Sequence, residues 1–207
     1  MKPLPLKQLT VASTNPGKAG EIRTVLTGLD AWSVLPLPEN LPPVDETGQT
    51  FLENAILKAE AYSRVLGESA DWVVADDSGI VVDALDGRPG IFSGRYAEND
   101  ELRNKKLLGE LEGVRGDRRS AHFVCTLVLA KQGKALWSTE GRVDGMIAVE
   151  PVGRHGFGFD PVFYLPDREL TMGQLPPETK NRISHRGRAL AELRRHLESG
   201  DFQQPVI

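Results

Sequence analysis

The sequence predicts a mixed α/β protein, and three features of the chain carry that prediction. Apolar runs of strand length alternate along the chain with segments of helical periodicity. Two further apolar runs, residues 122–130 and 135–143, lie on either side of the polar stretch "KQGK", as expected for a long antiparallel hairpin. Apolar residues make up 40% and charged residues 26% of the 207 residues, which is typical of a globular protein. Alternating strands and helices favour parallel pairing, and the hairpin adds antiparallel strands, so we expect a mixed sheet.

The first half of the chain contains two well-marked helix starts. Asn15 precedes Pro16, which predicts an N-cap followed by proline at the first helical position. Thr50 and Glu53 have the spacing of a capping box before the helical segment "FLENAILKAEAYSRVL". Strands are expected at residues 9–12, 31–35, 72–75 and 80–82.

The second half adds helices and one aromatic strand. We expect a loop over residues 86–97, a helix over 99–111 and a strand after "GRHGFGFDP". Ser184 is the expected N-cap of a last helix, whose inward residues are Ala189, Leu190, Leu193 and Leu197.

Composition excludes several classes of protein. The single cysteine, Cys125, lies in the apolar run "FVCTLVLA", which indicates core packing, rules out an internal disulfide and disfavours a thiol metal site. No apolar stretch is long enough to span a membrane, so we expect a cytoplasmic protein with no membrane partner. A net charge of −4 argues against a protein that coats nucleic acid.

Charge is unevenly distributed, however. A basic run lies between Lys180 and Arg195, whereas the acids Asp45, Glu46, Asp76 and Asp77 all lie in the first half. The two groups could be opposite walls of one cleft or unrelated surface faces.

Two adjacent carboxylates, Asp76 and Asp77, lie between apolar runs in "DWVVADDSGIVVDAL". Carboxylates this close repel each other unless a cation neutralises them, and Mg²⁺ is the cation that prefers such ligands. Because neighbouring strand residues point to opposite faces, we expect the two acids to have different tasks. The alternative is that Asp76 caps a turn and Asp77 faces solvent.

Three other motifs suggest a nucleotide ligand. "STNPGK" is a strand-to-helix turn that is not a Walker motif; its free N–H groups and Lys18 could bind phosphate, or the turn could be a plain helix cap. The phenylalanines in "GFGFDP" could stack on a base or pack in the core. His185 and Arg186 in "ISHRGRAL" suit a phosphate or keto oxygen, or form a solvated surface pair.

Together, "VASTNPGK", "ETGQTFLENAILKA", "ADDSGIVVDAL", "PGIFSGRYA", "GFGFDPVF" and "ISHRGRAL" resemble, in this order, the motifs of the inosine triphosphate pyrophosphatase family. The resemblance runs from about Leu9 to Leu197 and leaves out the first residues and the tail "SGDFQQPVI". It implies one domain over residues 1–207, with an elongated two-lobed α/β fold and a central substrate cleft. It also implies a cytoplasmic, Mg²⁺-dependent homodimer that removes ITP, dITP and XTP from the nucleotide pool by releasing pyrophosphate.

The resemblance also implies roles for individual residues. Asp77 is the expected base and, with Glu46, a metal ligand, while Asp76 supports the site. The expected triphosphate-binding residues are Ser13, Thr14, Asn15, Pro16, Gly17, Lys18 and Lys58, and Ser78 is expected to touch the substrate. The expected base-binding residues are Phe157, Gly158, Phe159, Asp160, Lys180, His185 and Arg186.

Two other functions fit the same sequence. A related pyrophosphatase acting on modified pyrimidine triphosphates would differ only in its base pocket. A non-catalytic nucleotide- or RNA-binding module would use the basic run and the two phenylalanines, but it leaves Glu46, Asp76 and Asp77 without a purpose.

Overall fold

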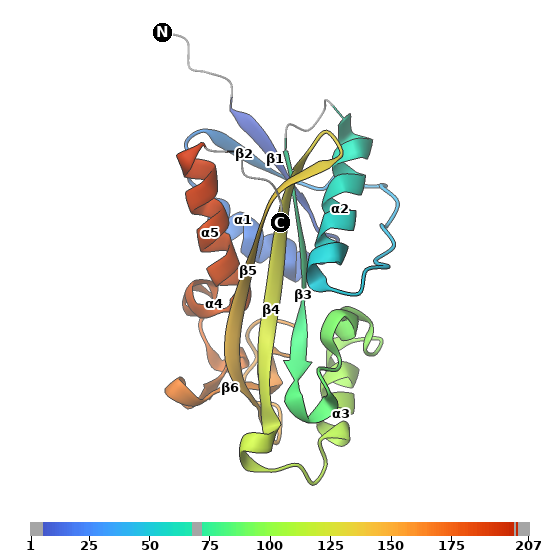
Figure 1. Cartoon of the computed structure of the whole chain (residues 1–207). Helices are drawn as coiled ribbons and strands as arrows, with labels where there is room; N and C mark the ends of the chain where they lie inside the picture. The colour runs from blue at the N-terminus through green and yellow to red at the C-terminus, as the bar shows by residue number, and fades with distance from the viewer. Residues whose placement is uncertain (1–5, 68–71, 201, 203–207) are drawn as a thin grey trace. The chain divides into compact units, whose positions relative to one another are not determined.

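The computed structural model describes residues 6–67, 72–200 and 202. Parts of the N-terminal segment and of the tail, which the sequence places outside the family pattern, fall outside these residues. The helices and strands, shown in Figure 1, are β1 (Lys7–Ala12), α1 (Pro16–Leu26), β2 (Trp32–Pro36), α2 (Phe51–Leu66), β3 (Trp72–Val82), α3 (Asp100–Glu110), β4 (Ser120–Lys131), β5 (Lys134–Ile147), β6 (Phe163–Leu165), β7 (Leu170–Thr171), α4 (Pro177–Ile183) and α5 (His185–Ser199).

The strands form a mixed sheet, as predicted. Within the described residues the strand order is β2-β1-β3-β4-β5-β6-β7. β1 pairs in parallel with β2 and β3, while β6 pairs antiparallel with β5 and β7. The hairpin between β4 and β5 is confirmed, and its two turn residues, Gln132 and Gly133, have φ values of 52° and 74°. Positive φ at both positions is the conformation that the common two-residue hairpin turn requires.

The strand that carries the two acids corrects one prediction. We expected two strands, one on each side of Asp76 and Asp77, but β3 runs unbroken from Trp72 to Val82. Aspartate is disfavoured in strands, which is why the sequence indicates a break. Ion pairs described below compensate each carboxylate on its own face of the strand, so the backbone continues as a strand.

The described residues fall into two compact units, which we describe separately. Unit 1 comprises residues up to 77 together with 125–141 and those from 188 onward, and unit 2 comprises residues 78–124 and 142–187. In unit 1, alternate residues of β3 pack against different helices. Trp72 and Val74 pack in one cluster with α1 and α5, and Val73 and Ala75 pack in another with α2.

Unit 2 has its own apolar core. Ile80 and Val82 of β3 pack with Leu107 of α3, Phe123 of β4 and Phe163 of β6.

Of the helices in the described part of the chain, none combines the length and apolar composition needed to span a bilayer. Cys125 and the four inward residues predicted for the last helix are buried, which confirms those predictions.

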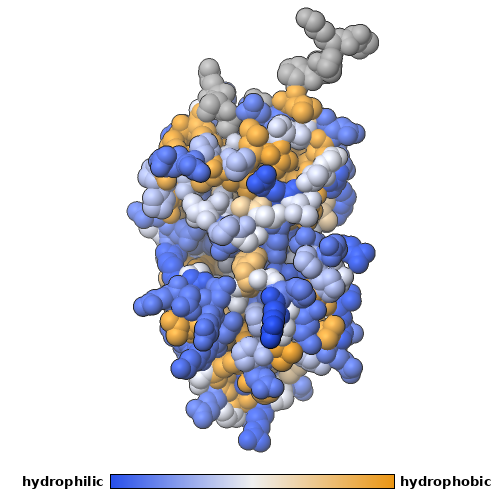
Figure 2. Space-filling view, turned by 180° about the vertical axis from the view of Figure 1, so that it is seen from behind, coloured by the Kyte–Doolittle hydropathy of each residue, from blue (hydrophilic) through white to orange (hydrophobic). Residues whose placement is uncertain are grey.

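Figure 2 shows one face of the surface, where hydrophilic residues predominate and hydrophobic residues lie scattered among them. Large exposed apolar side chains include Val65, Phe92 and Val149. Single exposed apolar residues are ordinary on protein surfaces. The homodimer therefore stays a prediction from the resemblance.

Candidate functional site

The turn between β1 and α1 has the structure that the sequence predicts. Asn15 is the N-cap of α1, and its Oδ1 accepts a hydrogen bond from the backbone N–H of Lys18 at 3.1 Å. Pro16 is the first helical residue, and the Ser13 hydroxyl donates to the carbonyl of Asn15 at 3.5 Å. Thr14 is exposed in the same turn. Pro16 has no N–H and that of Lys18 is bonded to Asn15, so the N–H of Gly17 and the Lys18 side chain are the groups that this helix N-terminus, where the dipole favours anions, brings together.

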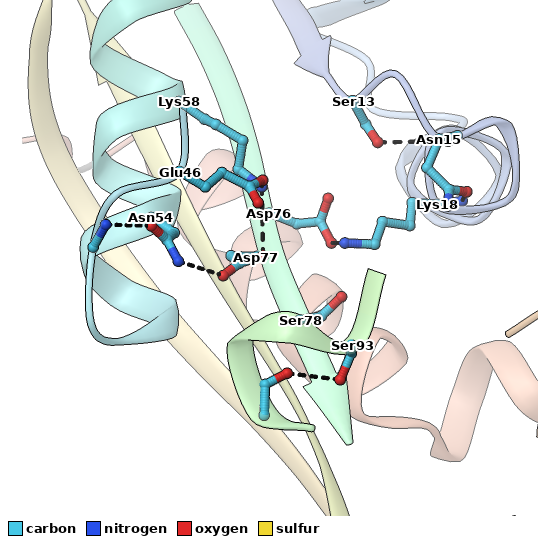
Figure 3. Close-up of polar contacts among 12 residues, drawn as sticks. Ser13, Asn15, Lys18, Glu46, Asn54, Lys58, Asp76, Asp77, Ser78 and Ser93 are labelled. Atoms are coloured by element: carbon cyan, nitrogen blue, oxygen red, sulfur yellow. Dashed lines mark hydrogen bonds and ion pairs between the residues drawn. The ribbon is translucent and has the colours of Figure 1, made fainter. Parts of the chain in front are cut away.

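Asp76 faces this turn. Its Oδ2 lies 3.1 Å from Lys18 Nζ, and only 2% of the residue is exposed (Figure 3). The pair lies on the face of β3 that packs against α1. Because a buried carboxylate needs a charged partner, Asp76 fixes the Lys18 ammonium at the helix start.

Asp77 faces the other way, toward α2. Its Oδ1 lies 3.6 Å from Lys58 Nζ, and its Oδ2 accepts a hydrogen bond from Asn54 Nδ2 at 3.3 Å (Figure 3). Lys58 Nζ also donates to Glu46 Oε1 at 2.7 Å. The two acids thus point to opposite faces of the strand and have different partners: one lysine pairs with Asp76, and another links Asp77 with Glu46. That they have different tasks stays a prediction.

Burial and charge shift two pKa values here. Burial raises the pKa of Asp77 above its usual value, against the opposing effect of Lys58 and Lys18. Burial alone would lower the pKa of Lys58, but the carboxylates of Asp76, Asp77 and Glu46 outweigh it and raise that pKa. Lys58 therefore stays protonated at neutral pH, and Asp77 has a stronger affinity for a proton than an exposed aspartate has.

Asn54 is a site residue that the sequence analysis missed. Its Oδ1 accepts the N–H of Gly48 at 2.8 Å, so the same amide that contacts Asp77 also holds the loop that carries Glu46. A Cβ on Gly48 would lie 2.6 Å from Glu53 Cβ, so the loop needs glycine to approach the helix this closely. The available signal was spacing, because residues four apart lie on one face of a helix, and Asn54 precedes Lys58 by four.

The oxygen atoms around Lys58 fit a Mg²⁺ ion in type. Glu46 and Asp77 both lie within contact distance of one cationic group, and carboxylate oxygens are ligands that Mg²⁺ prefers. Within the described ranges no group of three or more His, Cys, Asp or Glu side chains is arranged to hold a metal. Mg²⁺ takes one or two protein carboxylates, and water and substrate phosphates complete its coordination. Asp45, the neighbouring acid, is exposed.

In unit 2, Asp160 is the centre of a second group of predicted residues. Its Oδ2 accepts from Lys180 Nζ at 2.5 Å and from the N–H of Phe157 at 2.8 Å. Lys180 Nζ lies 4.6 Å from the centre of the Phe157 ring. Gly156 has a φ of 78°, and a Cβ there would lie 2.0 Å from Asp160 Oδ2. Asp160 therefore links the backbone at Phe157 to Lys180, and it leaves no room for a side chain at residue 156.

His185 and Arg186 are both buried at the start of α5. The His185 ring stacks on Phe123, with 4.5 Å between ring centres. Arg186 Nη2 donates to the Ser78 hydroxyl at 2.8 Å, and its guanidinium lies 5.6 Å from the centre of the Phe157 ring. Phe159 is buried against Tyr96 and is a core residue, which was the alternative that the sequence left open. Ser184 accepts the N–H of Gly187 at 3.1 Å, which confirms its predicted role at the helix start.

The basic run does not form one surface. Lys180, His185 and Arg186 are buried in unit 2, whereas Arg194 of unit 1 bonds backbone carbonyls of Val25 and Thr27. The basic run therefore divides in two. One part is the buried group in unit 2, in which Lys180 and Arg186 lie beside Phe157, and the other consists of residues with structural or surface positions.

Comparison with known proteins places this geometry in context. The Ham1 family model matches residues 9–196. A dITP/XTP pyrophosphatase from Geobacillus kaustophilus is 49% identical over 193 residues, which cover 91% of this chain and 93% of that protein. A dITP/XTP pyrophosphatase from Geobacter sulfurreducens is 46% identical over 197 residues, covering 93% and 97%. The solved structure of a HAM1 protein from Coxiella burnetii superposes with a TM-score of 0.84 at 38% identity and covers 94% of this chain and all of that one.

Proposed function

Because this chain belongs to the Ham1 family, we propose that it hydrolyses deaminated purine nucleoside triphosphates to the monophosphate and pyrophosphate. The substrates dITP and XTP come from the names of relatives that are 46–49% identical over more than nine tenths of the chain. ITP follows from the resemblance of the sequence motifs. Such an enzyme removes these nucleotides from the pool before they enter DNA or RNA.

The arrangement of Asp77, Lys58 and Glu46 is the observation that best supports this proposal. Hydrolysis at a phosphorus atom needs a base for the attacking water and cations for the phosphate charge. Asp77 lies in a continuous core strand and is held by Asn54 and Lys58, so its carboxylate is fixed in position. Rigid support of this kind is what a catalytic group requires.

We assign the following steps to the residues of unit 1. Asp77 takes the proton of the water that attacks the α-phosphorus, and the bond to the β-phosphate oxygen breaks to release pyrophosphate. Lys18, Lys58 and the N–H of Gly17 at the start of α1 bind the phosphate oxygens and stabilise the charge that develops on them. Glu46 and Asp77 would hold Mg²⁺, which when bound neutralises phosphate charge and lowers the pKa of water.

We assign the purine to residues of unit 2. Arg186 has only hydrogen-bond donors, and the 6-keto group of hypoxanthine or xanthine is an acceptor. Adenine has an amino donor at the same position, so donor would face donor and binding would be disfavoured. Phe157, which lies beside Lys180 and Arg186, offers an aromatic ring for stacking on the base.

A panel of nucleoside triphosphates tests the proposal. We expect pyrophosphate from dITP, XTP and ITP with Mg²⁺, much less from ATP, and none when the metal is removed with EDTA. Modified pyrimidine triphosphates as the preferred substrates would favour the related pyrophosphatase instead. Release of orthophosphate would contradict cleavage next to the α-phosphate, and binding without turnover would indicate a non-catalytic module.

Three parts of the expectation stay predictions. They are the homodimer, the cytoplasmic location, and the single elongated domain with two lobes around a central cleft. Sedimentation of the purified protein over a range of concentrations tests the first.

A further inference from the structure

Helix α3 binds the backbone of Gly158, in the "GFGFDP" segment, on both sides of its Cα. Asp100 Oδ2 accepts the backbone N–H of Gly158 at 2.7 Å. Asn104 Nδ2 donates to the carbonyl oxygen of the same glycine at 3.1 Å. Asp100 and Asn104 are four residues apart, so both side chains leave the helix on one face. Neither residue belongs to the motifs that the sequence analysis assigned to the substrate.

The burial of Asn104 and an ion pair of Asp100 limit how these side chains can move. Asn104 is 6% exposed, and its bond to Gly158 compensates part of the cost of burying the amide, whose Oδ1 has no hydrogen-bond partner among the described residues. Asp100 Oδ1 pairs with Arg103 Nη1 at 2.7 Å, and Arg103 also donates to the carbonyls of Gly94 and Ala97. The carboxylate that receives the Gly158 N–H is therefore oriented in advance by its own partner.

Gly158 needs this support because of its conformation. Its φ of 63° is in the left-handed region, where a regular strand or helix does not hold the backbone. A Cβ at this position would meet no atom within 4 Å, so the glycine is there for its backbone angle and not for lack of space. The orientation of the peptide groups before and after it sets the direction of the chain on both sides, at Phe157 and at Phe159.

We propose that Asp100 and Asn104 are positioning residues for purine recognition, which act by fixing the two peptide groups that flank Gly158 and thereby the Phe157 ring. This inference rests on the proposed function, which assigns Phe157, Lys180 and Arg186 to the base. The ring is the element that Lys180 and Arg186 share, since both cations lie beside it. A shift of the Gly158 peptide would move the ring away from these cations.

A matched pair of acidic residues tests the proposal. Asp100 and Glu101 both lie in the first turn of α3, so replacing either one by alanine removes the same favourable interaction with the helix dipole. Only Asp100 contacts Gly158; Glu101 is exposed. We expect Asp100→Ala to raise KM for dITP about tenfold, with a smaller change in kcat, and to narrow the dITP/ATP ratio of kcat/KM. Glu101→Ala should keep both values.

Two conservative variants separate positioning from general destabilisation. Asp100→Asn keeps a side-chain oxygen that can accept the Gly158 N–H, so it should recover most of the dITP/ATP ratio. Asn104→Asp has the same shape as the native residue but replaces the donor with an acceptor facing the Gly158 carbonyl, so it should narrow the ratio. Hydrogen exchange of the peptide that contains residues 156–160 should accelerate in Asp100→Ala and not in Glu101→Ala.

The possible contrary results have distinct meanings. If Asp100→Ala slows dITP and ATP hydrolysis equally, or leaves the exchange of residues 156–160 unchanged, the residue does not position the purine site. If wild-type protein keeps its preference for dITP and Asp100→Ala does too, only this inference fails. If wild-type protein releases no pyrophosphate from any deaminated purine triphosphate, the proposed function fails and this inference fails with it.

Discussion

Each unit holds a buried aspartate beside a lysine, but the two aspartates have different neighbours. In unit 1, Asp77 shares Lys58 with Glu46, and Asp76 pairs with Lys18 on the other face of the strand. In unit 2, Asp160 pairs with Lys180 and also accepts the N–H of Phe157. The unit 1 group thus contains three carboxylates and two ammonium groups. The unit 2 group contains one carboxylate, the Lys180 ammonium and the Arg186 guanidinium, and both cations lie beside Phe157.

The difference shows how the balance of charge, and not the residue types alone, selects a ligand. A surplus of carboxylate favours a further cation, such as Mg²⁺ carried with a triphosphate. A surplus of donors beside an aromatic ring favours a flat ligand with acceptor atoms, such as a keto purine. The predictions below change one group at a time, starting with the largest effect that we expect.

Asp77→Asn tests the carboxylate surplus of unit 1 most directly. The amide keeps the shape of the side chain but cannot take a proton from water, so we expect turnover of dITP to fall at least about 100-fold. Circular dichroism should show an unchanged fold, and pyrophosphate release measures the rate. Asp45→Asn is the control, because Asp45 is an exposed acid of the loop that carries Glu46. A folded Asp77→Asn protein with normal turnover would remove Asp77 from the mechanism.

Arg186→Ala tests the donor surplus of unit 2. We expect it to lower kcat/KM for ITP. The activation free energy should rise by about 1–3 kcal/mol, the size of one good bidentate contact to a base. The slow hydrolysis of ATP should hardly change, so the ITP/ATP ratio narrows. Arg182→Ala, at an exposed arginine of α4, is the control for loss of one positive charge. An equal fall for both substrates would show that Arg186 serves the phosphates.

The sequence predicted local features of the fold well because their causes are local. The N-cap Asn15, the capping box at Thr50 and the hairpin turn depend on residues that are close in the chain, and all three are confirmed. The continuous strand β3 was missed because what stabilises Asp76 and Asp77 comes from Lys18 and Lys58, which are distant in sequence.

The same distinction applies to the candidate site. The motif residues in unit 1 and unit 2 were named from the sequence, and the structure groups Lys18 with Asp76 and Lys58 with Glu46 and Asp77. Asn54, Asp100 and Asn104 were not named, because each acts through a hydrogen bond to a residue far along the chain. A polar residue on a helix gives no indication of such a partner until the helix has been packed.

Gly156→Ala tests how closely the loop packs on Asp160 in unit 2. Alanine at this position must adopt a positive φ, and its Cβ would also collide with Asp160 Oδ2 beside Lys180. Gly158→Ala is the matched control, since it too requires a positive φ but its Cβ has open space. The collision alone should lower the free energy of unfolding by about 1–3 kcal/mol more than the control does. Denaturation of both variants measures this difference; equal losses would mean that the loop moves aside at little cost.

Thr50→Ala should have the smallest effect, and it acts on unit 1 alone. The Thr50 hydroxyl accepts the N–H of Glu53 at 3.1 Å and caps α2, the helix that carries Asn54 and Lys58. Loss of such a cap costs about 1 kcal/mol of stability.

All three tryptophans, Trp32, Trp72 and Trp137, belong to unit 1, so tryptophan fluorescence during urea denaturation follows the unfolding of this unit. Thr47→Ala, at an exposed threonine of the preceding loop, is the control. The dITP/ATP ratio should stay constant in both variants, because the cap lies in unit 1 and the proposed purine residues lie in unit 2. A changed ratio in Thr50→Ala would show that the two charge groups do not act separately in choosing the substrate.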